Sequence, residues 1–377
     1  MAISKKIVFL TGTRADFGKI KSLIEIARDN PAFEVHIFAT GMHMDKKYGY
    51  TVNELEKYGY DNIYKYINHD AESSMDITLS RTIEGFANYI RLIEPDVIIV
   101  HGDRIEALAG ATVGALNNIL VAHIEGGELS GTVDELIRHA VSKLSHVHFV
   151  ANKEAKARLK QMGEIDASIF VIGSPDMDAM LHKPLPAWQE VKYNYEIPFD
   201  NFFISMFHPV TTEFDKMDCY AANYITALEE SNVNFVAIYP NNDKGSDFIL
   251  NKLKRLAKNS RFKIFPSIRF EAFLVLMKKS KAVVGNSSAG IREAPFYGIP
   301  TVNVGTRQLG RTNNPDIINT SYKKEEIING ILKAGSQKIT PNVLFGDGKS
   351  DEKFIDIISN DVFWNIPKQK IFTDSKL

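Results

Sequence analysis

Short apolar runs alternate with longer amphipathic stretches from end to end of the chain. The apolar runs are continuous in Val, Ile and Phe, which is typical of parallel strands covered on both faces. Helices are expected between them, for example over residues 18–29, 105–116, 134–144 and 154–161. Strands are expected in two series, the first at residues 6–11, 34–40, 96–101, 120–124, 146–151 and 169–172, and the second at residues 202–207, 234–239, 262–265, 282–284 and 301–304.

The repeated strand–helix order predicts an α/β fold made of two Rossmann-like, doubly wound domains that face a cleft. Residues 173–188 separate the two series and carry three of the 14 prolines, so they are the best candidate for a linker. We therefore expect an N-terminal domain over residues 1–174 and a C-terminal domain over residues 175–350. Residues 351–377 keep an apolar set that includes Phe354 and Trp364, which predicts a helical tail packed back on the first domain.

Composition places the chain among ordinary globular proteins, because 44% of its residues are hydrophobic and 24% are charged. The formal net charge of −1 gives no indication of a nucleic-acid partner or of a membrane surface. The apolar run at residues 7–10 is too short for a signal peptide or a membrane span, so we interpret it as a buried strand and expect a cytoplasmic protein. The single cysteine, Cys219, excludes an intramolecular disulfide and is expected to be a small core residue.

Polar residues follow nearly every expected strand, at the edge where ligands of open α/β sheets bind. Three carboxylates in the first half, Asp103, Glu125 and Asp134, are the candidates for proton chemistry, because clustered carboxylates push one another's pKa values apart. Asp134 has an alternative interpretation as an acid that stabilises the first turn of a helix. His101 and His123 also end strands, and we interpret both as hydrogen-bonding residues rather than metal ligands.

The segment 285–290, Gly-Asn-Ser-Ser-Ala-Gly, has two interpretations. Its Asn and Ser side chains either cap a helix, or its small residues admit a phosphate to the free amides of a helix start. Arg292, Arg307 and Arg311 follow closely, and guanidinium groups match phosphate oxygens, which favours a bound diphosphate. The sequence shows neither a Gly-x-Gly-x-x-Gly fingerprint after the first strand nor a Walker loop, and its histidines lack metal-ligand spacing. It therefore gives little support to a dinucleotide cofactor and none to a metal.

Several long motifs occur in a fixed order along nearly the whole chain. They are Gly12-Thr13-Arg14-Ala15-Asp16, His101-Gly102-Asp103-Arg104, His123-Ile124-Glu125-Gly126-Gly127-Glu128-Leu129-Ser130-Gly131, Phe207-His208-Pro209-Val210-Thr211-Thr212, Gly285-Asn286-Ser287-Ser288-Ala289-Gly290-Ile291-Arg292-Glu293 and Gly305-Thr306-Arg307-Gln308. This set resembles the UDP-N-acetylglucosamine 2-epimerases, specifically the hydrolysing branch that feeds sialic-acid synthesis in bacteria. The non-hydrolysing branch typically shows Gly-Asp-Thr, His-x-Glu-Ala-Gly and Asp-Ser-Gly-Gly instead.

The resemblance implies a glycosyltransferase-B-like fold, no cofactor, and a homodimer or a dimer of dimers. It matches Asp103, Glu125 and Asp134 to the family's catalytic carboxylates. Ser287 and Ser288 match its diphosphate-binding loop. The other matched positions are a ribose-hydroxyl acceptor at Glu293, a sugar-side contact at His43, and substrate or nucleotide contacts at Arg14, Asp16, Lys19, Arg104, His208 and Arg307.

The implied reaction converts UDP-N-acetylglucosamine and water to N-acetylmannosamine and UDP, by elimination through a glycal and then hydration. Which carboxylate is the base and which is the acid stays open. Three alternatives also stay open: a hydrolysing epimerase for a 2,4-diacetamido-trideoxy UDP-sugar, a glycosyltransferase of the same fold, and a non-catalytic nucleotide-sugar sensor. A transferase can manage with one catalytic carboxylate, and a sensor would gain nothing from the three carboxylates.

Overall fold

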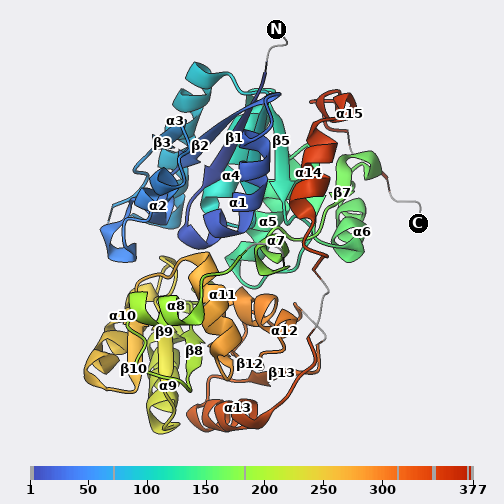
Figure 1. Ribbon diagram of the computed structural model, residues 1–377. Helices are drawn as coiled ribbons and strands as arrows, with labels where there is room; N and C mark the ends of the chain where they lie inside the picture. The colour runs from blue at the N-terminus through green and yellow to red at the C-terminus, as the bar shows by residue number, and fades with distance from the viewer. Residues whose placement is uncertain are drawn as a thin grey trace. The chain divides into compact units, whose positions relative to one another are not determined.

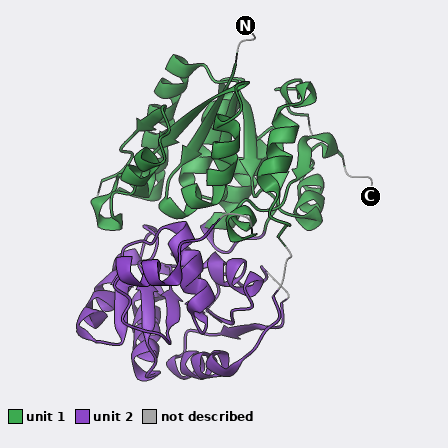
Figure 2. Ribbon diagram, in the orientation of Figure 1, with its two compact units in different colours: residues 1–128, 134–183, 345–377 green, residues 129–133, 184–344 purple. Residues whose placement is uncertain are grey.

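The structure is a computed structural model that describes residues 4–70, 73–181, 184–311, 314–341, 345–371 and 373–374. The chain divides into two compact units (Figure 2). Unit 1 comprises residues 1–128, 134–183 and 345–377, and unit 2 comprises residues 129–133 and 184–344. The division therefore falls after residue 183, nine residues beyond the expected boundary at 174, and a short insertion at 129–133 belongs to unit 2.

Unit 1 is built on a parallel sheet that has seven strands in the described residues, in the order β3-β2-β1-β4-β5-β6-β7. The order reverses between β1 and β4, which is the topological switch point of a Rossmann-like sheet. The strands are β1 (Lys5–Thr11), β2 (Phe33–Ala39), β3 (Ile63–Lys65), β4 (Val97–His101), β5 (Leu120–Ile124), β6 (Val147–Val150) and β7 (Ile169–Val171).

Helices enclose this sheet because its central strands are apolar on both faces (Figure 1). The helices are α1 (Arg14–Arg28), α2 (Val52–Lys57), α3 (Met75–Ile93), α4 (Ile105–Leu116), α5 (Val133–Leu144), α6 (Lys153–Gln161), α7 (Asp176–Leu181), α14 (Ser350–Ile358) and α15 (Asp361–Trp364), with short 3-10 turns at Gly41–Met44, Lys46–Tyr48 and Asp166–Ser168. Helix α3 packs against α4, whereas α1 packs against α7 and α14.

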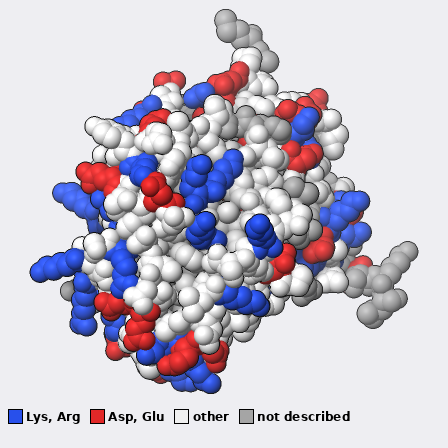
Figure 3. Space-filling model, turned by 60° about the horizontal axis from the view of Figure 1, so that its bottom comes forward, with Lys and Arg blue, Asp and Glu red and all other residues white. Residues whose placement is uncertain are grey.

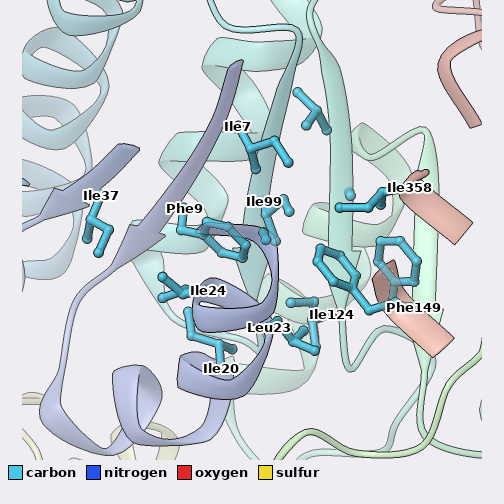
Figure 4. Close-up of a cluster of buried hydrophobic side chains, with 14 of the residues drawn as sticks. Ile7, Phe9, Ile20, Leu23, Ile24, Ile37, Ile99, Ile124, Phe149 and Ile358 are labelled. Atoms are coloured by element: carbon cyan, nitrogen blue, oxygen red, sulfur yellow. The ribbon is translucent and has the colours of Figure 1, made fainter. Parts of the chain in front are cut away.

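The segment after residue 350 completes the core of unit 1. Phe354 and Ile358 of α14 and Phe363 of α15 are buried in the same hydrophobic cluster as Phe9 and Phe149 (Figure 4). Asp178 of α7 fixes the start of α14, because its carboxylate accepts hydrogen bonds from the backbone and hydroxyl groups at the first turn of that helix. The helical tail is therefore an integral part of this unit.

Unit 2 repeats the same topology, with six parallel strands in its described residues ordered β10-β9-β8-β11-β12-β13. Its switch point lies between β8 and β11. The strands are β8 (Phe203–Met206), β9 (Phe235–Ile238), β10 (Phe262–Phe265), β11 (Val283–Gly285), β12 (Thr301–Val304) and β13 (Ile317–Thr320). The helices are α8 (Trp188–Asn194), α9 (Met217–Glu230), α10 (Ser246–Arg255), α11 (Phe270–Lys279), α12 (Glu293–Phe296) and α13 (Lys324–Ser336), with 3-10 turns at Thr211–Lys216, Leu256–Lys258 and Ser288–Gly290.

Each strand expected from the sequence is present, and its ends lie within one residue of the expected ends. Strands β3 and β13 were not expected. Both are short edge strands without a continuous buried run, so they lack the pattern that identified the others. The expectation for Cys219 was wrong, because this residue lies on the exposed face of α9.

The surface carries both signs of charge, intermixed over the face that Figure 3 presents. This distribution agrees with the near-neutral net charge of −1. Within the described residues, none of the helices combines the length and the apolar character needed to cross a bilayer.

Candidate active site

The first strand of unit 1 leads directly into a capped helix. Helix α1 begins at Arg14, four residues before the expected start at residue 18, because the Thr13 hydroxyl accepts a hydrogen bond from the Asp16 amide at 3.0 Å. Arg14 and Asp16 therefore lie in the first turn of the helix, and Lys19 lies one turn further on. The Asp16 carboxylate in turn accepts hydrogen bonds from the Thr11 hydroxyl at 2.8 Å and from the Gly12 amide at 3.1 Å.

His101, the last residue of β4, lies between two carboxylates. Its Nδ1 is 2.7 Å from Oδ1 of Asp16, and its Nε2 is 3.3 Å from Oε2 of Glu125. Burial by itself lowers the pKa of His101, but the charges and hydrogen bonds of Glu125 and Asp16 raise it to about 9. Burial also opposes ionisation of Asp16, yet hydrogen bonds from His101 and its other donors hold the pKa of Asp16 below its usual value. At neutral pH His101 is therefore an imidazolium held between Asp16 and Glu125.

Glu125 follows β5 and is held in an uncommon backbone conformation, with φ at +65°. Its side chain is buried, and Oε1 accepts a hydrogen bond from the Ser174 hydroxyl at 2.7 Å. A non-glycine residue in the left-handed region persists only where its surroundings fix it, and such residues gather at functional sites. Glu125 is thus held in one conformation directly after β5.

Arg138 of α5 connects the carboxylates, and sequence reasoning missed it. Its guanidinium group donates one hydrogen bond to the Asp103 carboxylate and another to the Glu125 backbone carbonyl. Asp134 lies in the first turn of the same helix, partly buried, four residues before Arg138 and therefore on the same helix face. That spacing is the signal that could have found Arg138. The structure thus brings Asp103 and Glu125 together through one buried arginine, with Asp134 on the helix that carries it.

Two further histidines near these strands are neutral. Burial lowers the pKa of His43 to about 4 and that of His123 to about 3, the largest influence in each case being the loss of water. His43 contacts the hydroxyl groups of Thr51 at 2.8 Å and Thr11 at 3.2 Å. His123 contacts Oγ of Ser142 at 3.1 Å and the Gly102 carbonyl at 2.8 Å. His43 is therefore fully buried and bonded within unit 1, and His123 has the hydrogen-bonding role expected of it.

The basic residues expected to contact substrate are already paired in unit 1. Arg14 forms an ion pair with Glu54. Lys19 lies 3.4 Å from a carboxylate oxygen of Asp176. Arg104, at the start of α4, lies 3.3 Å from Oε2 of the buried Glu106. These partners hold the three cations at the carboxyl edge of the sheet, in the elements that follow β1 and β4.

Asn286 organises the corresponding edge of unit 2. Its side-chain oxygen accepts a hydrogen bond from the His208 amide at 2.6 Å, and its side-chain nitrogen donates to the His208 carbonyl at 2.9 Å. Its backbone carbonyl accepts from Arg307 at 3.2 Å and from Gln308 at 3.0 Å. Nδ1 of His208 accepts from the Asn241 amide at 3.0 Å, so the neutral imidazole carries its proton on Nε2. This single buried amide therefore joins the loops that follow β8, β11 and β12.

The small-residue loop after β11 has the geometry of a helix cap. Gly285 has φ at +138°, and an added Cβ would lie 1.9 Å from the Met206 carbonyl oxygen, so only glycine fits there. The Ser287 hydroxyl accepts from the Ala289 amide at 3.3 Å, as in the capping interpretation, whereas Ser288 is partly exposed. Glu293 follows as the buried first residue of α12. Both expected serines and Glu293 thus lie on one short segment of unit 2, together with Asn286.

Among the residues that the structure describes, no group of three or more His, Cys, Asp or Glu side chains could hold a metal ion. The charged cluster of unit 1 is instead composed of carboxylates neutralised by His101 and Arg138.

Comparison with known proteins connects this geometry to one family. The chain is 50% identical over 377 residues to a UDP-N-acetylglucosamine 2-epimerase from Neisseria meningitidis, covering 99% of this chain and 100% of the relative. It is 33% identical over 354 residues to a hydrolysing UDP-N,N'-diacetylbacillosamine 2-epimerase from Legionella pneumophila, covering 93% and 94% of the two chains. It is also 32% identical over 363 residues to the polysialic acid biosynthesis protein P7 of Escherichia coli, covering 94% and 89%.

A solved structure of a UDP-N-acetylglucosamine 2-epimerase has the same fold. The UDP-N-acetylglucosamine 2-epimerase of Methanocaldococcus jannaschii, crystallised with UDP-N-acetylglucosamine and UDP, superposes with a TM-score of 0.78 at 22% identity, covering 94% of this chain and 99% of that chain. This likeness supports the expected glycosyltransferase-B-like architecture of two parallel sheets with interleaved helices. The family model described as UDP-N-acetylglucosamine 2-epimerase matches residues 25–359. The chain therefore belongs to the UDP-N-acetylglucosamine 2-epimerase family.

Proposed function

We propose that the protein is a hydrolysing UDP-N-acetylglucosamine 2-epimerase, which converts UDP-N-acetylglucosamine and water to N-acetylmannosamine and UDP. The observation that carries the proposal is the charged network at the carboxyl edge of the unit 1 sheet. There His101 joins Asp16 to Glu125, and Arg138 joins Asp103 to the backbone of Glu125. Buried charges are costly unless they are paired and hydrogen-bonded, and such clusters with shifted pKa values gather at functional sites, so the network supports an active site here.

The reaction needs a proton to leave C2 on one face of the sugar and another to arrive on the opposite face. In the first step a base removes the C2 proton while the C1–O bond breaks. The electron pair of the C1–O bond leaves with UDP, and the pair of the C2–H bond forms the double bond of 2-acetamidoglucal. In the second step water adds hydroxyl to C1 and a proton reaches C2 from the other side. Asp103, Glu125 and Asp134 are the groups that we assign to these transfers, because two faces require more than one carboxylate.

Positive charge develops at C1 as UDP departs, because the C2 hydrogen is poorly acidic. The carboxylates of unit 1 stabilise that charge, and His101 and Arg138 hold two of them in place. Ser174 and the uncommon backbone of Glu125 fix the direction of its carboxylate. The arrangement is built in advance, so little reorganisation is needed when the charge appears.

We assign the UDP portion to unit 2. Asn286 bonds His208 and Arg307 at one edge of the sheet, next to Ser287 and Ser288. Guanidinium and hydroxyl groups recognise diphosphate oxygens, and a buried carboxylate such as Glu293 can accept hydrogen bonds from ribose hydroxyls. In unit 1, Arg14, Asp16, Lys19 and Arg104 are assigned to the remaining substrate contacts, whereas the buried His43, expected as a sugar-side contact, bonds Thr11 and Thr51 instead.

The hydrolysing assignment is supported by the Gly-Asp-Arg and His-Ile-Glu-Gly-Gly-Glu motifs and by the hydrolysing relative at 33% identity. The test is a proton NMR time course with UDP-N-acetylglucosamine as the only sugar. We expect UDP and free N-acetylmannosamine to appear together. Accumulation of UDP-N-acetylmannosamine without release of UDP would overturn the hydrolysing assignment, and absence of turnover without an added acceptor would favour a transferase.

The same relative motivates the second candidate substrate, UDP-N,N'-diacetylbacillosamine. Competition between the two UDP-sugars, measured as the ratio of kcat/KM, decides between them. We expect UDP-N-acetylglucosamine to be preferred, because the relative at 50% identity carries that name. The relative named for polysialic acid biosynthesis supports a role of the product in sialic-acid synthesis.

The proposal includes the homodimer implied by the family resemblance and the cytoplasmic location expected from the sequence. Light scattering coupled to size-exclusion chromatography tests the first, and cell fractionation tests the second. A monomer at working concentration would contradict the dimer without affecting the proposed chemistry.

A further inference from the structure

Helix α5 contributes to the candidate active site along its whole length. Asp134 lies in its first turn, and Arg138 one turn later binds Asp103 and the Glu125 carbonyl. Near its end, Oγ of Ser142 contacts Nδ1 of His123, whose Nε2 lies 2.8 Å from the carbonyl of Gly102, the neighbour of Asp103. The position of α5 therefore determines where the side chains of Asp134 and Arg138 lie.

A lysine from a distant part of the chain binds the C-terminal end of α5. The last turn of a helix leaves carbonyl groups without partners inside the helix, and a cation is favourable there. Nζ of Lys370 lies 3.2 Å from the Ser142 carbonyl oxygen, 2.9 Å from that of Lys143 and 2.5 Å from that of Ser145. One ammonium group thus binds three carbonyls at the end of this helix.

A buried carboxylate holds Lys370 in this place. Oε2 of Glu164 accepts from Lys370 at 2.6 Å and lies 3.0 Å from Nε2 of His148, while Oε1 accepts from Lys143 at 2.7 Å. Burial by itself raises the pKa of Glu164, but hydrogen bonds from these three partners lower it to about 2. The segment is also held by its backbone, since the Lys368 carbonyl lies 3.0 Å from Nε2 of His146.

We propose that Lys370 is a positioning residue, which acts on the reaction by holding α5 at the register that places Asp134 and Arg138. This inference rests on the proposed function, which assigns proton transfer to Asp134 and to Asp103, the carboxylate that Arg138 holds. A helix moves as a stiff element, so a shift at its last turn reaches its first turn. A displacement of about 1 Å at a catalytic group can cost up to roughly 100-fold in rate. Binding of UDP, assigned to unit 2, does not depend on Lys370.

The test compares Lys370→Met with Lys368→Met, which removes a charge two residues away and leaves the Lys368 carbonyl in place. In Lys370→Met, backbone amides in and after the last turn of α5 should exchange with deuterium roughly three- to thirtyfold faster. We expect kcat to fall by about three- to tenfold, with KM and UDP affinity unchanged within about twofold. Lys368→Met should behave as wild type, and Lys370→Arg should recover most of the loss because it keeps the cation.

A double-mutant cycle identifies the route of the effect. If Lys370 acts through α5, its replacement should change kcat much less in an Asp134→Asn background, because the catalytic group that it positions is already lost. Equal effects in both backgrounds would overturn the proposal. Should Lys370→Met fail to fold, Glu164→Gln tests the same contact, because it removes the charge that holds the ammonium while keeping the side-chain shape.

The exchange experiment separates this inference from the proposed function. Wild-type protection of the α5 amides in Lys370→Met, together with unchanged kcat, would overturn the role of Lys370 whatever the reaction is. Absence of turnover of UDP-N-acetylglucosamine by the wild-type enzyme would overturn the proposed function, while the exchange rates would still report on the lysine contact. An equal fall of kcat in Lys370→Met and Lys368→Met would also overturn the proposal.

Discussion

The two sheet edges of this protein are held together in different ways. At the edge of unit 1 the connections run between charged side chains, from Asp16 through His101 to Glu125 and from Asp103 to Arg138. At the edge of unit 2 the central connection is a neutral residue, Asn286 of the loop after β11, which binds backbone and side-chain groups of the loops after β8 and β12. In each unit this edge is formed by the carboxyl ends of the strands beside the switch point, and the two sheets share one topology.

This difference has a physical consequence. Charged groups coupled through short contacts respond to the arrival or loss of a proton, because each one changes the pKa of its neighbours. A neutral amide bonded to backbone groups does not titrate, so it keeps loops in one geometry at any working pH. Unit 1 is therefore suited to proton transfer, and unit 2 to rigid recognition of an anion. The predictions below test that division, beginning with the largest expected effect.

The carboxylates of unit 1 should matter for chemistry and little for binding. Asp103→Asn, Glu125→Gln and Asp134→Asn keep the side-chain shape but remove the ability to exchange a proton near neutral pH. We expect kcat to fall by roughly 10²–10⁴ while UDP affinity, measured by calorimetry, stays near the wild-type value. Wild-type product formed in deuterium oxide should carry deuterium at C2. Near-normal turnover in all three variants would show that the chemistry lies elsewhere.

Asp178 offers a matched control for these substitutions. It is a buried carboxylate of the same unit, but its partners are Ser22, Ser350 and the amide of Asp351 at the start of α14. Asp178→Asn should therefore lower the unfolding midpoint and leave kcat of the folded enzyme unchanged.

His101 should give the stability of the protein a dependence on alkaline pH. Its pKa is about 9 in the folded protein and 6.5 ordinarily, so the folded state binds the proton more tightly. The resulting stabilisation, roughly 3 kcal/mol, is complete below pH 6.5 and is lost as pH rises through about 9. Urea unfolding of wild type and His101→Gln at several pH values should show this dependence in the wild type and a flatter curve in the variant.

The acid side of the same experiment reports on other groups. The pKa values of His43 and His123 are lowered by burial, so these residues oppose folding only as pH falls below 6.5, when the unfolded chain takes up their protons. His101→Gln should leave the contribution of His43 as it is, but it should change the acid limb through Asp16, because His101 lowers the pKa of that carboxyl. A wild-type curve without any loss of stability between pH 6.5 and 9 would mean that His101 is not an imidazolium in the folded protein.

Loss of a charged contact in unit 2 should affect binding first. Arg307→Ala is expected to weaken UDP binding by about 1.5–3 kcal/mol, the range for a hydrogen bond to a charged group. Lys324→Ala removes a cation of the same unit that pairs with the exposed Glu230 on another helix, so it should leave UDP affinity unchanged. Equal UDP affinity in wild type and Arg307→Ala would remove this arginine from the site, and would weaken the contrast between the units.

The fold could be predicted from the sequence because its signal is local. Each central strand is a continuous apolar run, and a run such as Val97–His101 retains that pattern whatever its neighbours are. Edge strands such as Ile317–Thr320 are only partly covered, and their residues carry no such pattern. The insertion of residues 129–133 into unit 2 depends on close approach of Gly131 to the Arg307 backbone, which no local pattern reveals.

Of the candidate site, the sequence could predict only residues that follow buried strands or lie in the motifs. Asp103 and Glu125 were identified because charge follows buried strands there. Arg138 was missed because an arginine on an amphipathic helix is ordinarily a solvent-facing residue, and only the tertiary structure shows it to be buried against Asp103. The charge state of His101 was equally out of reach, since it depends on two carboxylates that are 85 and 24 positions away along the chain.

The smallest expected effect concerns the support of the Arg307 loop. The Tyr322 hydroxyl donates to Oε2 of Glu213 at 2.8 Å and accepts from the Thr306 amide at 3.3 Å, while its ring stacks on Tyr220 at 3.7 Å between centroids. Tyr322→Phe keeps the stacked ring and removes only the hydroxyl, which connects Thr306 to Glu213 alongside the direct 3.0 Å bond from the Thr306 hydroxyl to Glu213. We expect UDP affinity to fall by about 0.5–1.5 kcal/mol, the net value of one hydrogen bond, because the loop before Arg307 becomes looser. Deuterium incorporation at C2 should stay complete, since the groups to which we assign proton transfer belong to unit 1.

Tyr224→Phe is the matched control for this last prediction. The Tyr224 hydroxyl is also buried in unit 2, but it contacts Ser205 at 2.8 Å and the Val284 carbonyl at 2.9 Å, inside the sheet rather than in the loop. Its removal should lower the free energy of unfolding by a similar amount and leave UDP affinity unchanged. If both variants weakened UDP binding equally, the effect would come from general loosening of unit 2 rather than from the loop. If neither did, the Tyr322 hydroxyl would not contribute to holding Arg307.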